Sequence, residues 1–178
     1  MSADTTGRLR LFFALWPAPE AARALHEWAV RAQRQTGGRV TRAETIHLTL
    51  VFLGELPAER LPRAVEAART VRFARHELPI DEARYWPDKR IVWVGPRRTP
   101  AETVALADRL RLALAAAGFE IERRPFTAHV TLLRKASRRG ELPALGPLAW
   151  PVEEFVLVRS RLSAQGADYE VLERFPAV

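Results

Sequence analysis

The sequence predicts an α+β fold built from two similar strand–helix–strand halves related by a pseudo-twofold axis. The string at residues 47–50 (HLTL) returns at residues 129–132 (HVTL), so a histidine followed two residues later by a threonine occurs twice, 82 residues apart. The same offset aligns the strand-like residues 9–15 with the segment that begins at residue 91, and two helical stretches with each other. We expect antiparallel sheets that line a central cleft, with the helices outside.

The first half begins with an apolar strand at 9–15, and a helix follows over 19–35. This helix carries one apolar stripe, formed by Ala21, Leu25, Trp28 and Ala32. A glycine pair at 37–38 ends it. The next strand, 46–53, alternates in character: His47, Thr49 and Val51 share one face, and the apolar face holds Ile46, Leu48, Leu50 and Phe52.

The second half repeats this order with a strand at 91–95, a helix over 100–117 and a strand at 129–134. Residues 99–102 (TPAE) predict a capping box with Pro100 at the first helical position, and Gly118 ends the helix. A further helix is expected over 58–70, and later strands lie near 78–84, 155–162 and 169–172.

Composition predicts one domain that spans residues 1–178, with two lobes whose signature strings lie around 46–53 and 128–134. The apolar run at 11–16 is too short for a secretory signal or a membrane span, so we expect a cytoplasmic protein that does not enter a membrane. The chain has no cysteine, which excludes disulfides and thiol chemistry.

A net charge of +7 favours a phosphate-bearing partner, although a GC-rich genome also enriches arginine. The densest basic cluster directly follows the second string and comprises Arg134, Lys135, Arg138 and Arg139. A solvated loop is the alternative interpretation of this cluster. Arg134 is the exception, because it closes the strand that carries His129.

Two histidines, two threonines and an arginine restrict the chemistry. A zinc site needs three or four protein ligands, and the sequence shows no others, so no metal is expected. None of the four serines lies in a recognisable nucleophile turn. Paired imidazoles suit acid and base catalysis near neutral pH, with hydroxyls and an arginine holding phosphoryl oxygens.

These strings resemble those of the 2H phosphoesterase superfamily, in particular its RNA 2',3'-cyclic phosphodiesterase group, also called 2'-5' RNA ligases. The resemblance runs nearly end to end. It rests on residues 8–15 (RLRLFFAL), 46–55 (IHLTLVFLGE), 126–134 (FTAHVTLLR) and a closing hairpin of Ser160, Arg161 and Leu162 with Gly166 and Tyr169. Ala128 departs from the proline expected before the second histidine.

The resemblance implies that water opens a terminal 2',3'-cyclic phosphate of RNA to a 2'-phosphomonoester without metal or cofactor. It implies His129 as the general base and His47 as the general acid, although the near symmetry of the two strings leaves the opposite order open. Thr49, Thr131 and Arg134 would hold the phosphate. The reverse reaction would form a 2'-5' bond. The expected partner is RNA with a cyclic phosphate end, including tRNA fragments, and the expected state is a monomer.

Three aromatic residues, Phe12, Tyr85 and Trp86, are candidates to stack a terminal base, with simple packing as the alternative. His26 and His76 are expected to lie outside the site. Two other functions stay open: a non-catalytic RNA-binding module, and a related phosphodiesterase that acts on a small cyclic phosphate or nucleotide.

Overall fold

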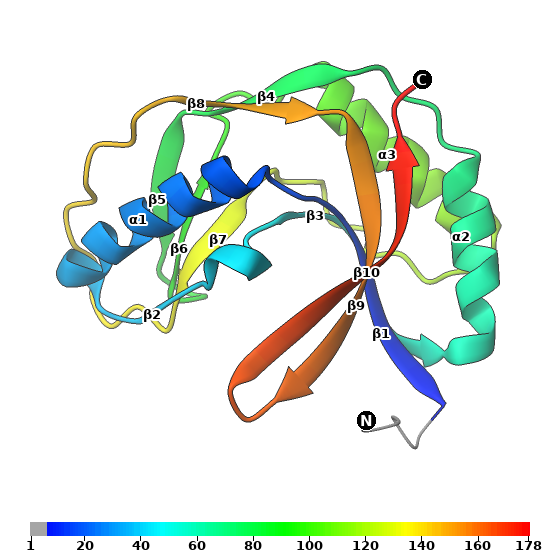
Figure 1. The fold of residues 1–178 in the computed structure, drawn as a ribbon, viewed down its shortest axis with the longest axis horizontal. Coiled ribbons are helices and arrows are strands. Elements are labelled where there is room, and N and C mark those ends of the chain that lie inside the picture. Colours follow the sequence, from blue (N-terminus) through cyan, green and yellow to red (C-terminus); the bar gives the residue numbers. More distant parts are fainter. Residues whose placement is uncertain (1–6) are drawn as a thin grey trace.

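Two four-stranded antiparallel sheets frame the molecule (Figure 1). The computed structural model describes residues 7–178. The first sheet has the order β10-β9-β1-β3 and comprises Gly166–Pro176, Glu154–Ser163, Arg8–Leu15 and Leu48–Pro57. The second has the order β2-β7-β6-β5 and comprises Arg39–Val40, Val130–Arg134, Ile91–Gly95 and Glu82–Trp86. A short pair, β4 (His76–Ile80) and β8 (Leu148–Val152), completes the strands of the described residues.

Within residues 7–178, three α-helices cover the outer faces of these sheets: α1 (Pro19–Thr36), α2 (Leu61–Arg69) and α3 (Ala101–Ala116). Helix α1 follows β1 in the chain, yet it packs against β2 and β7 of the second sheet. Helix α3 follows β6, yet it packs against β3 and β4 (Figure 1). The two halves therefore exchange their helices. None of the helices within residues 7–178 has the length and apolarity needed to cross a bilayer.

The predicted α+β architecture of two strand–helix–strand halves is confirmed. In the first half β1 pairs with β3, and in the second half β6 pairs with β7, both antiparallel. The predicted strand at 78–84 is divided at Asp81 into β4 and β5, which belong to different sheets. The predicted helix at 58–70 begins as a 3-10 turn, Ala58–Arg60, before α2. Strands β2 and β8 had no signal in the sequence.

The predicted capping box before α3 does not form. The helix begins at Ala101, which makes Pro100 the N-cap residue, and no side chain caps the helix. A capping box needs Thr at the N-cap position and Glu three residues after the N-cap. Thr99 precedes the N-cap residue by one position, and Glu102 is only two residues after it.

Strand β1 is buried on both faces, which explains the continuous apolar run at 11–16. Leu11, Phe13 and Leu15 belong to the main core. Phe12 and Ala14 point the other way, into a small second cluster with Val156 and Val158 of β9. Phe12 of this second cluster packs against His47, one of the two predicted site histidines.

Phe52 does not lie on the apolar face of β3 as the alternation predicted. The register of β3 against β1 shifts twice, once at Leu50 and once at Leu53. Each bulge adds an unpaired residue and reverses the side-chain alternation. Leu50 and Val51 are consequently both buried, and Phe52 is 44% exposed.

Helix α3 offers a direct test of the core. Leu110 is fully buried and Leu112 is 71% exposed on the same helix. Leu110→Ala should lower the free energy of unfolding by about 3 kcal/mol, because it removes buried methyl groups and leaves a cavity. Leu112→Ala should change it by less than about 0.5 kcal/mol. Urea denaturation measures both, and equal losses would contradict the described packing of α3.

Candidate active site

A cleft of about 760 Å³ lies between the two sheets. Both histidines and both threonines of the repeated strings line it, from β3 on one wall and β7 on the other. Each histidine directly precedes its strand, and each threonine is the second residue of the strand. The pseudo-symmetric halves thus bring together four side chains from strings that are 82 residues apart in the sequence.

The imidazole of His47 is fixed by hydrogen bonds at both nitrogens. Nδ1 lies 2.7 Å from the carbonyl oxygen of Thr45, and Nε2 lies 3.1 Å from Oγ1 of Thr49. A carbonyl can only accept, so Nδ1 carries a proton in the free protein. In the neutral ring Nε2 then accepts from the Thr49 hydroxyl.

Three aromatic rings surround His47. Trp16 stacks on it with ring centroids 5.3 Å apart, Phe12 lies 4.9 Å away and Tyr169 meets it edge-on at 5.2 Å. Phe12 and Trp16 come from β1 and the residue just after it, and Tyr169 comes from β10. Since these rings keep water from the imidazole, they favour its neutral form.

His129 has the same backbone hydrogen bond but different neighbours. Its Nδ1 lies 2.8 Å from the carbonyl oxygen of Thr127, again two residues earlier. Trp86 and Trp93 contact its ring, with centroids 5.0 and 6.2 Å away. Among the described residues, no hydrogen bond joins His129 to the hydroxyl of Thr131. Nε2 of His129 is therefore not occupied by its own threonine, unlike that of His47.

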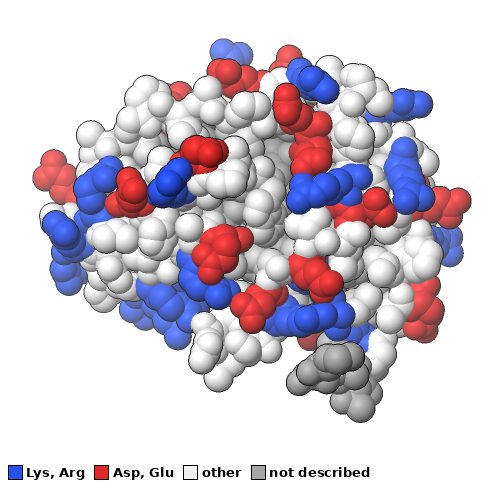
Figure 2. Space-filling model, viewed as in Figure 1, with Lys and Arg blue, Asp and Glu red and all other residues white. Residues whose placement is uncertain are grey.

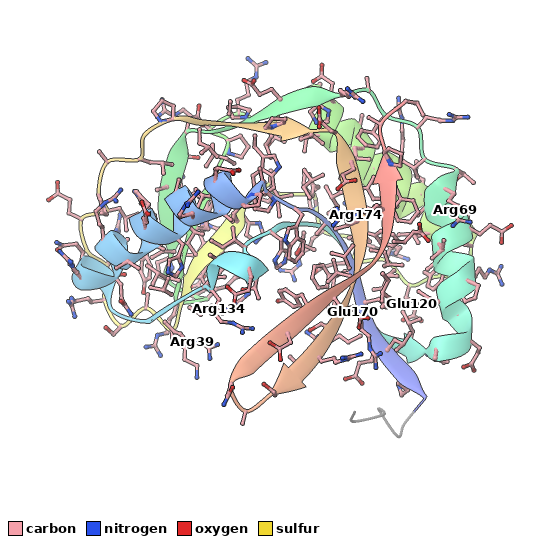
Figure 3. The ribbon with its side chains drawn as sticks, viewed as in Figure 1. Arg39, Arg69, Glu120, Arg134, Glu170 and Arg174 are labelled. Atoms are coloured by element: carbon pink, nitrogen blue, oxygen red, sulfur yellow. The ribbon has the colours of Figure 1, made fainter. Side chains whose placement is uncertain are left out.

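Basic side chains surround the cleft, and no Asp or Glu is part of its lining within residues 7–178. These cations are Arg10, Arg39, Arg42, Lys89 and Arg134. Arg134 ends β7 and lies beside Arg39 of β2 in Figure 3. Figure 2 shows Lys and Arg gathered over the same part of the surface. No three His, Asp or Glu side chains of residues 7–178 gather closely enough to hold a metal ion.

Burial lowers the pKa of both histidines. Desolvation is the main cause at His47, where the positive charges of Arg134 and His129 add to it and the pKa falls to about 4. Desolvation is also the main cause at His129, where Lys89 and Arg134 lower the pKa further. Arg134 thus acts on both imidazoles. Both rings are neutral at pH 7 in the free protein.

The structure separates the three aromatic candidates. Phe12 is buried beneath His47, and Trp86 contacts His129 without lining the cleft. Tyr85 lines a different hollow, shared with Arg84 and Arg139. Of the basic cluster after the second string only Arg134 lines the cleft, so the other three fit the solvated-loop interpretation.

Sequence reasoning gave no role in the site to several residues of the cleft. Trp16 and Tyr169 flank His47, Lys89 acts on His129, and Ser160 lies buried in the wall. Arg10, Arg39 and Arg42 also went unnoticed. The one available signal was the basic composition, which does not say where each arginine points. His26 and His76 lie outside the cleft, each hydrogen-bonded to a backbone carbonyl.

Each of the two lobes contributes one histidine and one threonine to a single basic cleft. This arrangement defines a hydrolase of the two-histidine phosphoesterase class. The family model described as LigT like Phosphoesterase matches the chain twice, at residues 15–93 and 94–169. The chain belongs to this family. Its two matches correspond to the duplication inferred from the 82-residue offset.

Named relatives cover nearly the whole chain. The RNA 2',3'-cyclic phosphodiesterase of Escherichia coli K12 is 35% identical over 167 residues, which cover 93% of this chain and 95% of the relative. That of Thermus thermophilus is 36% identical over 180 residues, which cover 94% and 89%. The crystal structure of E. coli LigT complexed with 3'-AMP superposes with a TM-score of 0.87 at 33% identity and covers 96% of this chain and 99% of that one. These relatives favour an enzyme over a non-catalytic module.

The low pKa of His47 makes stability depend on pH. Its folded pKa is about 4, below its unfolded value of about 6.5, so the unfolded chain binds more protons between these values. Stability from this group is present above pH 6.5 and is lost as the pH falls toward 4. Between pH 7 and pH 4 the protein should lose about 3 kcal/mol more unfolding free energy than the variant His47→Gln. Urea denaturation at both pH values measures this, and equal losses would contradict the burial of His47.

Proposed function

We propose that the protein hydrolyses the 2',3'-cyclic phosphate at the end of an RNA to a 2'-phosphomonoester by acid and base catalysis with His129 and His47. One observation carries the proposal. In both histidines Nδ1 donates a hydrogen bond to the backbone carbonyl two residues earlier, at 2.7 and 2.8 Å. Nε2 is therefore the nitrogen that each ring presents to the shared basic cleft.

In this reaction Nε2 of His129 takes a proton from water as the water oxygen attacks phosphorus. The bond from phosphorus to O3' breaks, and Nε2 of His47 gives its proton to the departing O3'. The substrate already carries one negative charge on its non-bridging oxygens, and attack adds a second. Arg134, whose positive charge lowers the pKa of both imidazoles, lies close enough to stabilise these charges. Thr49 and Thr131 donate hydrogen bonds to the same oxygens.

This order of roles is the one that the resemblance to the 2H phosphoesterases implies, and the surroundings of the two rings bear on how each role could be filled. Lys89 and Arg134 are permanent charges that oppose protonation of His129, which keeps its Nε2 lone pair available as a base. Desolvation is the main cost of protonating either ring, and at His47 a phosphate anion beside the ring would offset that cost directly. The substrate thus raises the pKa of His47, and the Thr49 hydroxyl turns from Nε2 to the phosphate.

RNA is the proposed substrate, since the named relatives act on RNA 2',3'-cyclic phosphates and the E. coli structure holds a ribonucleoside 3'-phosphate.

With a 5'-hydroxyl in place of water, the same two proton transfers would run backwards and form a 2'-5' phosphodiester. Water at high concentration makes that direction slow in dilute RNA. One chain supplies both histidines, so the proposed reaction needs no second copy of the protein.

Phosphorus NMR of a short RNA with a 2',3'-cyclic phosphate end tests the reaction directly. We expect the purified protein, with EDTA present, to convert the cyclic phosphate to a 2'-phosphate. A 3'-phosphate product would contradict the assigned leaving group. Unchanged RNA together with turnover of a small cyclic nucleotide would favour the other phosphodiesterase activity.

Replacing either cleft histidine should remove most of the activity. His47→Ala and His129→Ala should each lower kcat by about 10²- to 10⁴-fold, the usual effect of losing a general acid or base. His76→Ala is a matched control, because Nδ1 of His76 also lies near the carbonyl two residues earlier but the ring is outside the cleft. It should retain full activity. Near-normal turnover in both cleft variants would overturn the mechanism.

The depressed pKa values place the activity optimum on the acid side. The reactive form needs one imidazole protonated and the other neutral, so kcat/KM peaks between the two free-enzyme pKa values. One pKa is about 4 and the other lies below 6.5. We expect a maximum of kcat/KM between pH 4 and 6.5 and a tenfold fall per pH unit well above it. A maximum at or above pH 6.5 would contradict the lowered pKa values of the two rings.

A further inference from the structure

The cleft holds more positive charge than one reacting phosphate requires. A cyclic phosphate diester carries a single negative charge, and Arg134 alone matches it. Three other cleft cations, Arg10, Arg39 and Lys89, form no ion pair with any acid of residues 7–178. Arg42 is the exception, since its guanidinium lies 2.8 Å from Asp168. A polyanionic substrate would account for the excess.

Arg39 is the cleft cation whose neighbour along the sheet is another arginine. It lies directly opposite Arg134 in the antiparallel pair of β2 and β7, an arrangement in which like charges repel each other. The backbone fixes this position: a Cβ on Gly38 would lie 2.6 Å from the carbonyl oxygen of Arg134 and 2.9 Å from the amide of Ala136. Only glycine permits β2 to approach β7 so closely, so the two arginines cannot move apart by a shift of the strand.

The side chain of Arg39 extends toward the opposite wall. Its Nη1 lies 4.0 Å from the position a Cβ on Gly166 would occupy, at the tip of the β9–β10 hairpin. Tyr169, which contacts His47, is three residues further along β10, about 10 Å away. Arg39 therefore lies outside the reaction centre. Consistently, Arg134 lowers the pKa of both histidines, whereas Arg39 affects neither.

We propose that Arg39, between Arg134 and the β9–β10 hairpin, binds the phosphate on the 5' side of the terminal nucleotide and so makes the enzyme prefer oligoribonucleotides to mononucleotides. This inference rests on the proposed function and names a specificity-determining residue for it. The upstream phosphate relieves the repulsion between Arg39 and Arg134, because each guanidinium then faces an anion. Arg42, anchored to the carbonyl of Ala167 and to Asp168, holds the hairpin against this wall.

Product binding and turnover together test the proposal. Titrations with 2'-AMP and with the trinucleotide ApApA carrying a 2'-phosphate, followed by tryptophan fluorescence, give two dissociation constants for each protein. Arg39→Gln should lower the ratio of trinucleotide affinity to 2'-AMP affinity about fivefold, which is the scale of one exposed ion pair. It should also reduce the slope of log affinity against log salt for the trinucleotide by about one. Arg39→Lys should restore part of both, because it keeps the charge.

Arg63→Gln is the matched control, since Arg63 is an exposed arginine of α2 that does not line the cleft. It should leave both dissociation constants unchanged. The proposal is overturned if Arg39→Gln weakens both ligands equally, or neither, or if the wild-type protein binds the trinucleotide no better than 2'-AMP. Turnover of the trinucleotide with a cyclic phosphate end by the wild-type protein reports on the proposed function separately.

Discussion

The hydrogen bond from each histidine Nδ1 to the carbonyl two residues earlier is the interaction on which the site depends. It fixes the tautomer, because a carbonyl accepts only from a protonated nitrogen. It also fixes the direction of each ring, because the carbonyl belongs to the segment that enters the strand. His76 makes the same contact outside the cleft. The local geometry alone is therefore not a site, and two such rings must meet across one basic cleft.

The two halves repeat this geometry but surround it differently. His47 lies among Phe12, Trp16 and Tyr169, drawn from both ends of the chain, and its pKa falls mainly by desolvation. His129 lies beside two tryptophans, and Lys89 keeps a permanent charge near it. The two halves thus supply imidazoles with the same backbone contact but different neighbours, and burial lowers the pKa of both.

Features that depend on local periodicity could be predicted from the sequence. Features that depend on the pairing of strands distant in the sequence could not. The histidine and threonine strings, the strand–helix–strand order and Arg134 follow from spacing within short segments. The bulges of β3 depend on its register against β1, so the exposure of Phe52 was not foreseeable. Tyr85 and Trp86 were both candidates to stack a terminal base, although neighbours on a strand face opposite sides and only Trp86 contacts His129. The position of Arg39 required knowledge that β2 pairs with β7.

The exchange of helices helps to hold the two sheets at a constant distance from each other. Helix α1 is joined to β1 of one sheet and packs on β7 of the other, while α3 is joined to β6 and packs on β3. Separation of the sheets would strip both helices of their apolar contacts, including that of the fully buried Leu110. The proposed proton transfers need both imidazoles at a fixed distance from one phosphorus before substrate arrives. The exchanged helices meet that need through burial of apolar surface, and the hydrogen bonds of Arg42 to Ala167 and Asp168 add a polar connection across the cleft.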